Sequence, residues 1–325
     1  MEKQQSGHRI VYIDLMKGVC ITLVVIVHCD VEFPINILND MFQNLRMPLY
    51  FFLSGLFFKD YNDFFEFVLK KINKNVIPYM FFAFVPYAIF DVTFNPEVHK
   101  TWLYYVLMLI EPYNFPLWFL RSLFISYVIY WFVYRIHSIF WRGVLVFLLS
   151  YISWRASVEI PRSSWSFLME NFLTSLFALP FIYIATNIRR MGVLEQSYKP
   201  KQLLLLFVVA SLFWITCAQD NVYFFKADFG NTWPLLYFSA FGGIVVLWII
   251  CSKIRRLFYF SYVGRYSIVV LGTFCPIMRF LSTTFGITGA LQAFITLAIM
   301  PVMIYFFIRI FPWFTAQKDL IHINK

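Results

Sequence analysis

The sequence predicts an all-α, polytopic transmembrane helical bundle of about ten helices, forming one membrane-embedded domain over residues 1–325. Two observations predict this class. Of the 325 residues, 61% are hydrophobic and only 14% are charged, against roughly 25% in a soluble domain. The mean hydropathy is +0.69. A water-soluble fold could not bury so much apolar surface in one core, whereas a bilayer can cover it.

The individual helices follow from apolar stretches of the length that a bilayer requires. A helix needs about 20 apolar residues to cross the hydrocarbon, and fewer when anchoring residues flank it. The predicted spans are 10–29, 43–58, 76–94, 116–134, 143–158, 166–187, 202–218, 233–252, 257–280 and 289–311. The short apolar stretch 101–111 is bounded by prolines and is predicted to be an interfacial or re-entrant helix.

Basic residues orient the bundle. With the N-terminus inside, 17 lysines and arginines fall in cytoplasmic loops and termini and 5 on the opposite side. Ten spans then place both termini in the cytoplasm, in a multi-pass protein of a bacterial inner or plasma membrane. Asp14 and Lys17 interrupt the first apolar run, and no small-residue cleavage site follows, so we expect this helix to be retained.

The charge and the cysteines exclude several kinds of partner. The net charge of +10 comes from basic residues scattered between apolar stretches, as membrane topology requires, so no nucleic-acid partner is expected. The five cysteines have no CxxC spacing and lie mostly in apolar runs, which is typical of small buried hydrophobes. We predict no metal site and no bound cofactor; membrane lipid surrounds the protein.

The first span carries three ionisable residues, Asp14, Lys17 and His28. Such residues are costly in a membrane and usually face a protein interior or a cavity. Lys17 and His28 are eleven residues apart, which places them on one helix face about 16 Å apart along the axis, and Asp14 lies on the same side. Asp14 and Lys17 could instead form a structural ion pair near the headgroups, and His28 could be an interfacial histidine.

The second and fourth spans add further polar residues. Arg46 opens the second span and could be an anchor, and Ser54-Gly55 could serve close helix packing. In the fourth span, Trp118 precedes Arg121, which lies deep enough to need a carboxylate, a carbonyl or a ligand. Its possible carboxylate partners are Glu111 and Glu170, between which the sequence does not choose.

The predicted cytoplasmic stretch before the third span is basic. It contains Lys70, Lys71 and Lys74 within five residues. Ordinary positive-inside topology explains such a cluster, and so does a clamp for the phosphates of an anionic ligand from the cytosol.

Together these segments resemble the acyltransferase-3 family of membrane proteins. The hallmark is a basic residue, ten intervening residues and a histidine, which Lys17 and His28 match. Similar blocks follow in order along most of the chain: Tyr12 to Gly18, Arg46 to Gly55, Lys70 to Lys74 with Ile77-Pro78-Tyr79, Leu117 to Leu120 with Leu123, and Gly264 to Ser267. Lys17 and Met47-Pro48-Leu49 look most like the fucose 4-O-acetylase-related branch.

Two departures from the family pattern stand out. The family often has arginines where this chain has Lys71 and Lys74, and lysine loses the bidentate recognition of phosphate. A late histidine that sometimes follows the glycine-serine block is replaced by Phe274 and Cys275.

The resemblance implies transfer of an acyl group, often acetyl, from cytosolic acyl-CoA as co-substrate to a hydroxyl of an extracytoplasmic or lipid-linked cell-surface glycan. His28 is then the general base. Asp14, Lys17, Lys70, Lys71 and Lys74 would bind or orient the acyl donor, and Arg46, Ser54, Trp118 and Arg121 would serve the oxyanion or the acceptor. The rival hypothesis is a transporter or flippase of lipid-linked glycan, because buried charges also suit a substrate path.

Overall fold

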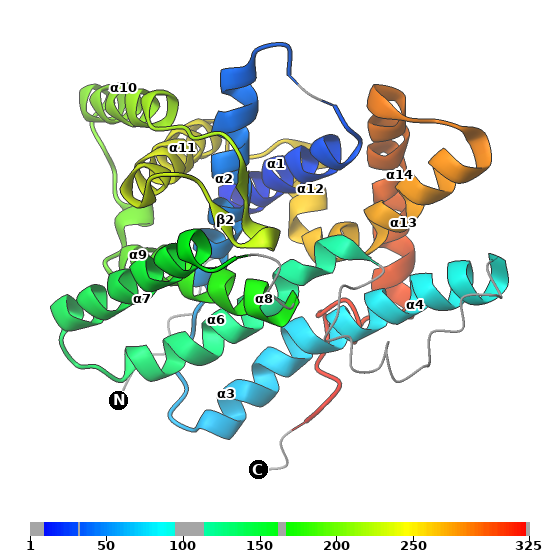
Figure 1. Cartoon of the computed structure of the whole chain (residues 1–325), viewed down its shortest axis with the longest axis horizontal. Helices are drawn as coiled ribbons and strands as arrows, with labels where there is room; N and C mark the ends of the chain where they lie inside the picture. Colours follow the sequence, from blue (N-terminus) through cyan, green and yellow to red (C-terminus); the bar gives the residue numbers. More distant parts are fainter. Residues whose placement is uncertain (1–9, 32, 95–113, 162–166, 323–325) are drawn as a thin grey trace.

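The computed structural model describes residues 10–31, 33–94, 114–161 and 167–322. The predicted re-entrant stretch 101–111 and Glu111 lie outside these ranges. Helices dominate the described chain, and its one small sheet pairs β1 (Val222–Tyr223) with β2 (Asp228–Phe229) (Figure 1). The α-helices are α1 (Val11–His28), α2 (Asn36–Gly55), α3 (Phe64–Lys71), α4 (Ile77–Phe94), α6 (Trp118–Tyr134), α7 (Ile139–Glu159), α8 (Phe167–Phe177), α9 (Leu179–Arg190), α10 (Pro200–Thr216), α11 (Trp233–Ile254), α12 (Phe258–Arg265), α13 (Ser267–Phe285) and α14 (Gly289–Ile310). Short π and 3-10 turns are η1 (Ile72–Val76), η2 (Phe115–Leu117), η4 (Val193–Glu195) and η5 (Phe224–Lys226).

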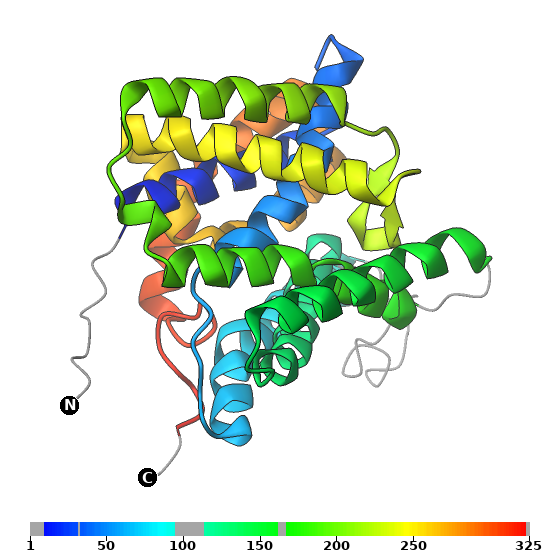
Figure 2. The same ribbon diagram turned by 90° about the vertical axis from the view of Figure 1, so that its left-hand side faces the viewer.

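The polytopic helical class is confirmed. Seven helical segments of the described residues are long and apolar enough to cross a membrane: 11–28, 115–134, 139–159, 168–190, 233–254, 267–285 and 289–310. The other three predicted spans correspond to α2, α4 and the shorter apolar helix α10. Figure 2 shows α10 (yellow-green) beside α11 (yellow) as an antiparallel pair.

Two predicted spans are each built from two helices. The span 257–280 divides at Tyr266, so that the short helix α12 ends there and α13 continues to Phe285. The span 166–187 divides at Ala178, two residues before Pro180, which has no N–H to continue the backbone ladder. The hydropathy of a stretch does not reveal such breaks, because the apolar composition runs through them.

Helix α2 lies in the centre of the bundle and contacts α1, α9 and α11. It begins at Asn36, seven residues before the predicted span, and contains polar residues such as Asn44 and Arg46. From Asn44 onward most of this helix is buried by protein, and the Asn44 amide donates to the backbone oxygens of Asp40 and Gln219.

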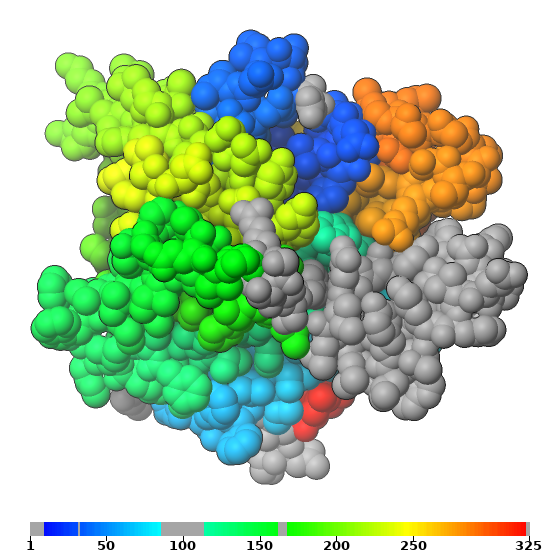
Figure 3. Space-filling view, in the orientation of Figure 1, coloured from blue at the N-terminus to red at the C-terminus, as the bar shows by residue number. Residues whose placement is uncertain are grey.

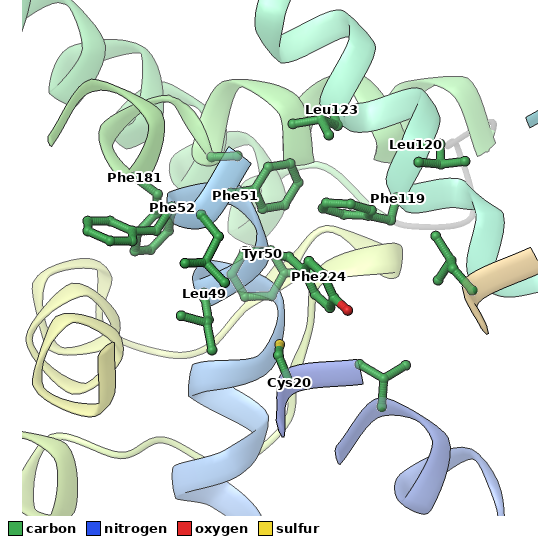
Figure 4. Packing of buried hydrophobic residues seen from close by; sticks show 14 of the residues in the cluster. Cys20, Leu49, Tyr50, Phe51, Phe52, Phe119, Leu120, Leu123, Phe181 and Phe224 are labelled. Atoms are coloured by element: carbon green, nitrogen blue, oxygen red, sulfur yellow. The ribbon is translucent and has the colours of Figure 1, made fainter. Parts of the chain in front are cut away.

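The core around α2 is aromatic. Phe51 lies 5.0 Å and Tyr50 lies 5.4 Å from the ring of Phe119 on α6, measured between ring centroids (Figure 4). Phe181 of α9 and Phe52 of α2 approach the same layer from the other side. All five cysteines are free; four are buried and Cys275 is half-buried, as expected of small hydrophobes. The dense packing on both sides of α2 holds the side chains of this helix in place.

Helices α1 and α12 cross with their backbones in contact. A Cβ atom on Gly264 would overlap the backbone oxygen of Asp14 and the backbone nitrogen of Gly18, and a Cβ on Gly18 would overlap the carbonyl of Phe260. Only glycine at both positions permits this approach. The crossing brings the start of α13 to the middle of α1, which in Figure 3 (blue) lies between the α10–α11 region and α13–α14 (orange).

Candidate active site

His28 is the last residue of α1, and its ring orientation is fixed by the backbone. Its Nδ1 lies 2.8 Å from the carbonyl oxygen of Val24. A carbonyl oxygen only accepts, so Nδ1 holds the proton in the neutral ring and Nε2 carries the free lone pair. The ring of Phe274 on α13 meets it edge to face at 5.3 Å. The carbonyl of Val24 therefore orients the ring of His28.

A polar outer cavity of about 610 Å³ opens on one side of His28. It lies between the end of α1, η2, α13 and the start of α14, on the side predicted to be extracytoplasmic. Its lining is rich in hydroxyl, amide and charged groups: Asp30, Arg279, Ser282, Thr283, Thr288 and Gln292. Cys275, at the position where the family pattern sometimes has histidine, also lines it. Side chains of these kinds suit a polyhydroxylated ligand.

A narrower inner cavity of about 160 Å³ lies on the other side of His28. Lys17 and His28 both line it, which follows from their shared helix face. Ser54 of α2 and Trp118 of α6 line it too, so four of the ten predicted site residues meet there. The remaining described wall is mostly apolar and aromatic. Among the described lining residues, His28 is the one titratable residue common to the two cavities.

Three of the six remaining predicted site residues lie outside both cavities at His28. Asp14 lines a separate cavity of about 230 Å³ with Arg256 and Arg265, so it does not share the cavity of Lys17. Arg46 lies beside Cys20, whose thiol donates to the Arg46 carbonyl at 3.1 Å. Arg121 of α6 lies 5.8 Å from the centre of the Tyr79 ring. None of the three lines either cavity at His28.

The predicted phosphate clamp is in contact with the C-terminal segment. Lys70 and Lys74 form ion pairs with Asp319 at 2.8 and 3.1 Å, and Lys74 also donates to the carbonyl of Ala316. The amide oxygen of Asn73 accepts from the backbone N–H groups of residues 320 and 321. We call this set of contacts the C-terminal clasp. Both of its segments are predicted to be cytoplasmic, and their contact agrees with that topology.

Lys71 lies in an aromatic cage. Its ammonium is 3.5 Å from the centre of the Tyr127 ring, with Phe67 and Phe58 at 5.6 and 5.9 Å. Burial, assisted by the charge of Lys59, lowers the pKa of Lys71 to about 7. An anion that approached Lys71 would raise this pKa again and so favour the charged ammonium.

The clasp is expected to depend on pH. Its hydrogen bond with Lys70 lowers the pKa of Asp319, and the same bond raises the pKa of Lys70. The stabilisation of the clasp by the Lys70–Asp319 pair is therefore complete between the ordinary pKa values of a carboxyl and a lysine, about 4 and 10. It is lost as the pH falls through the lowered pKa of Asp319 or rises through the raised pKa of Lys70.

Replacing Asp319 with asparagine should loosen the clasp near neutral pH. Because the pairs are partly exposed, we expect a loss of about 1 kcal/mol, or roughly fivefold faster amide exchange in residues 316–321. Exchange mass spectrometry on the full-length protein measures this, with Glu195→Gln as the control that breaks the Arg189–Glu195 pair elsewhere. Equal exchange in Asp319→Asn and wild type would contradict the prediction.

Sequence reasoning missed Tyr50, Asn75 and Ser267 in the inner cavity. Ser267 belongs to the glycine-serine block, and Asn75 directly follows the basic cluster. The sequence did not show which way either side chain points. Asp319 and Asn73 were missed because their contacts join residues about 250 positions apart.

The structure thus has helices long and apolar enough to cross a membrane, and two cavities that both adjoin His28. A comparison with protein-family models matches residues 10–314 to the acyltransferase-3 family, described as an acyltransferase domain. The match spans most of the chain, and the chain belongs to this family. It is therefore a multi-pass membrane acyltransferase. Comparisons with curated proteins and with solved structures found no match.

Proposed function

We propose that this acyltransferase moves an acetyl group from cytosolic acetyl-CoA to a hydroxyl of an extracytoplasmic or lipid-linked cell-surface glycan. The observation that carries the proposal is the position of His28, which lines both the inner and the outer cavity. Donor and acceptor can then approach the same ring from opposite sides. The assignment to the fucose 4-O-acetylase-related branch and to the cell membrane is part of the proposal.

The outer cavity suits the acceptor. Its carboxylate, guanidinium, hydroxyl and amide groups can pair with the hydroxyls of a sugar, and its volume of about 610 Å³ is in the range of ligand pockets. A hydroxyl placed near Nε2 of His28 would lose its proton to that nitrogen as its oxygen attacks the acyl carbon.

The inner cavity suits a short acyl group. A water molecule in the liquid occupies about 30 Å³, so 160 Å³ holds only a few small groups and would not hold a long fatty chain. Lys17, 4.4 Å from the centre of the Phe57 ring, provides a positive charge at the predicted inner end. Lys70, Lys71 and Lys74 would hold the phosphates, with the donor replacing Asp319 as the partner of Lys70 and Lys74.

The reaction needs no further cofactor. The acceptor oxygen forms a bond to the thioester carbon, and the carbon–sulfur bond breaks. His28 takes the hydroxyl proton and returns it to the leaving sulfur, so that free CoA and an O-acetylated glycan result. The rival reading as a flippase is not favoured by the family to which the chain belongs.

The decisive experiment gives radiolabelled acetyl-CoA to membranes that contain the full-length protein. We expect label in the extracted glycan fraction, and none in membranes without the protein. Palmitoyl-CoA should be a poor donor, because of the small inner cavity. Absence of glycan label with every acyl-CoA offered, together with protein-dependent movement of lipid-linked glycan, would favour the flippase instead.

A further inference from the structure

Asn75 carries a buried amide donor without a hydrogen-bond partner. Its side chain is 6% exposed, and among the described residues no group pairs with its Nδ2. More than nine in ten buried polar groups in proteins are hydrogen-bonded, because an unmet donor loses its bonds to water. An unmet donor of this kind can be completed by a ligand where its residue also lines a cavity, as Asn75 does.

The neighbouring Asn73 shows that the segment can satisfy an amide fully. Its Nδ2 donates to the carbonyl oxygens of Leu69 and Ile321, while its Oδ1 accepts two backbone N–H groups. The two asparagines are two residues apart, yet one is saturated by the C-terminal segment and the other is not. The difference lies in what each of them faces.

Local backbone geometry accounts for the direction of Asn75. The helix widens to a π-turn over Ile72–Val76, where the N–H of Ile77 bonds to the carbonyl of Ile72. Such turns insert a residue into a helix, shift the side chains that follow, and occur often at functional sites. Side chains two positions apart on a helix point about 200° apart. Asn73 accordingly faces the C-terminal segment, while Asn75 lines the inner cavity with Lys17, His28 and Ser54.

We infer that Asn75 is a catalytic residue that binds the acyl donor, its Nδ2–H donating a hydrogen bond to the thioester carbonyl oxygen. This inference rests on the proposed function. As the acceptor oxygen bonds to the carbonyl carbon, negative charge gathers on that carbonyl oxygen, and an amide donor turned toward it from the cavity wall strengthens the bond. When the carbonyl re-forms, the carbon–sulfur bond breaks and its electron pair leaves with the sulfur. The hydroxyl proton passes through His28 to that sulfur, and Asn75 keeps its amide protons.

Ser54 and Trp118 line the same cavity and were expected to serve the oxyanion. Asn75 differs from them in having a buried nitrogen to which no described group is hydrogen-bonded. Its place in the chain also fits, because it directly follows Lys74, the last lysine of the proposed phosphate clamp. One short segment would thus hold the donor by both its phosphates and its carbonyl.

The test replaces Asn75 with leucine, which has a similar size and no donor. Membranes with the full-length variant receive radiolabelled acetyl-CoA, and kcat and KM for acetyl transfer to glycan are measured together with the melting temperature in detergent. We expect kcat to fall 10²–10³-fold, with KM within about twofold and a melting temperature equal to or above wild type. The activity and the stability should thus move in different directions, since the leucine removes an unmet polar group.

The matched control is Thr296→Val on α14. Thr296 is also fully buried with an unmet hydroxyl, but it lines neither cavity at His28. Its kcat should stay at the wild-type value. Asn75→Ser keeps a small donor and should retain more activity than leucine. Asn75→Ala, which also has no donor, replaces the leucine variant if the latter does not fold.

The result that overturns the inference is a protein without a donor at this position, Asn75→Leu or Asn75→Ala, that has a wild-type kcat. A raised KM with unchanged kcat would also overturn it, since Asn75 would then bind the pantetheine arm rather than the reacting carbonyl. Failure of the proposed function looks different, because the wild-type protein itself would then transfer no acetyl group.

Discussion

Replacing His28 with glutamine should reduce acetyl transfer by 10²–10⁴-fold, the usual contribution of a general base. Glutamine can still donate from its amide to the carbonyl of Val24, which His28 contacts at 2.8 Å. The end of α1 should therefore keep its structure, while the basic nitrogen facing the cavities is lost. The measurement is label transfer from acetyl-CoA to glycan in membranes with equal amounts of each protein.

The control for His28 is the exposed His137, between α6 and α7. His137→Gln should transfer acetyl at the wild-type rate. A His28→Gln protein that keeps more than about a tenth of wild-type activity would remove His28 from the role of base. Phe274→Ala, which removes the ring that meets His28 edge to face, should give an intermediate loss of activity. Because Phe274 is fully buried, this variant should also lose about 3–5 kcal/mol of stability.

Replacing Gly264 with alanine should cost about 3 kcal/mol or more of stability. The added methyl would overlap the backbones of Asp14 and Gly18, which no side-chain rotation relieves. Helices α1 and α12 would have to separate, and they carry or adjoin Lys17 and Ser267 of the inner cavity. A displacement of about 1 Å can cost 10²-fold in rate, so activity should fall as well.

Thermal unfolding in detergent measures this effect, with a melting temperature about 5–10 °C below wild type. Gly192→Ala is the control, because Gly192 has a φ of +64° and nothing within 4 Å of an added Cβ. It carries the strain of a left-handed residue, about 1–2 kcal/mol, without a clash. Similar melting temperatures for the two variants would show that the bundle tolerates separation of α1 from α12.

Those parts of the site that depend on one helix could be predicted from the sequence. Lys17 and His28 line one cavity because helix geometry alone places them on one face. Apolar length likewise predicted the spanning helices, but not the break at Tyr266, which has no signature in hydropathy. The role of Gly264 as a crossing point emerges only once α12 lies on α1.

Parts of the site that join distant segments could not be predicted. The partner of Lys70 is Asp319, and many carboxylates could have been chosen from the sequence. Asn75 was not expected in the inner cavity, because hydrophobic periodicity does not show which buried side chains adjoin a cavity. Asp14 lines a cavity with Arg256 and Arg265, and the sequence does not show that these residues come together.

The position of His28 between two cavities has a consequence for the membrane itself. The inner and outer cavities are distinct, and the imidazole with the adjoining Phe274 ring stands where they approach each other. In the proposed reaction only the two-carbon unit crosses this partition, while CoA stays on one face and the glycan on the other. The acetyl group would then cross the membrane in one direction without a gate that opens to each side in turn. The barrier to ions and nucleotides would stay closed throughout turnover.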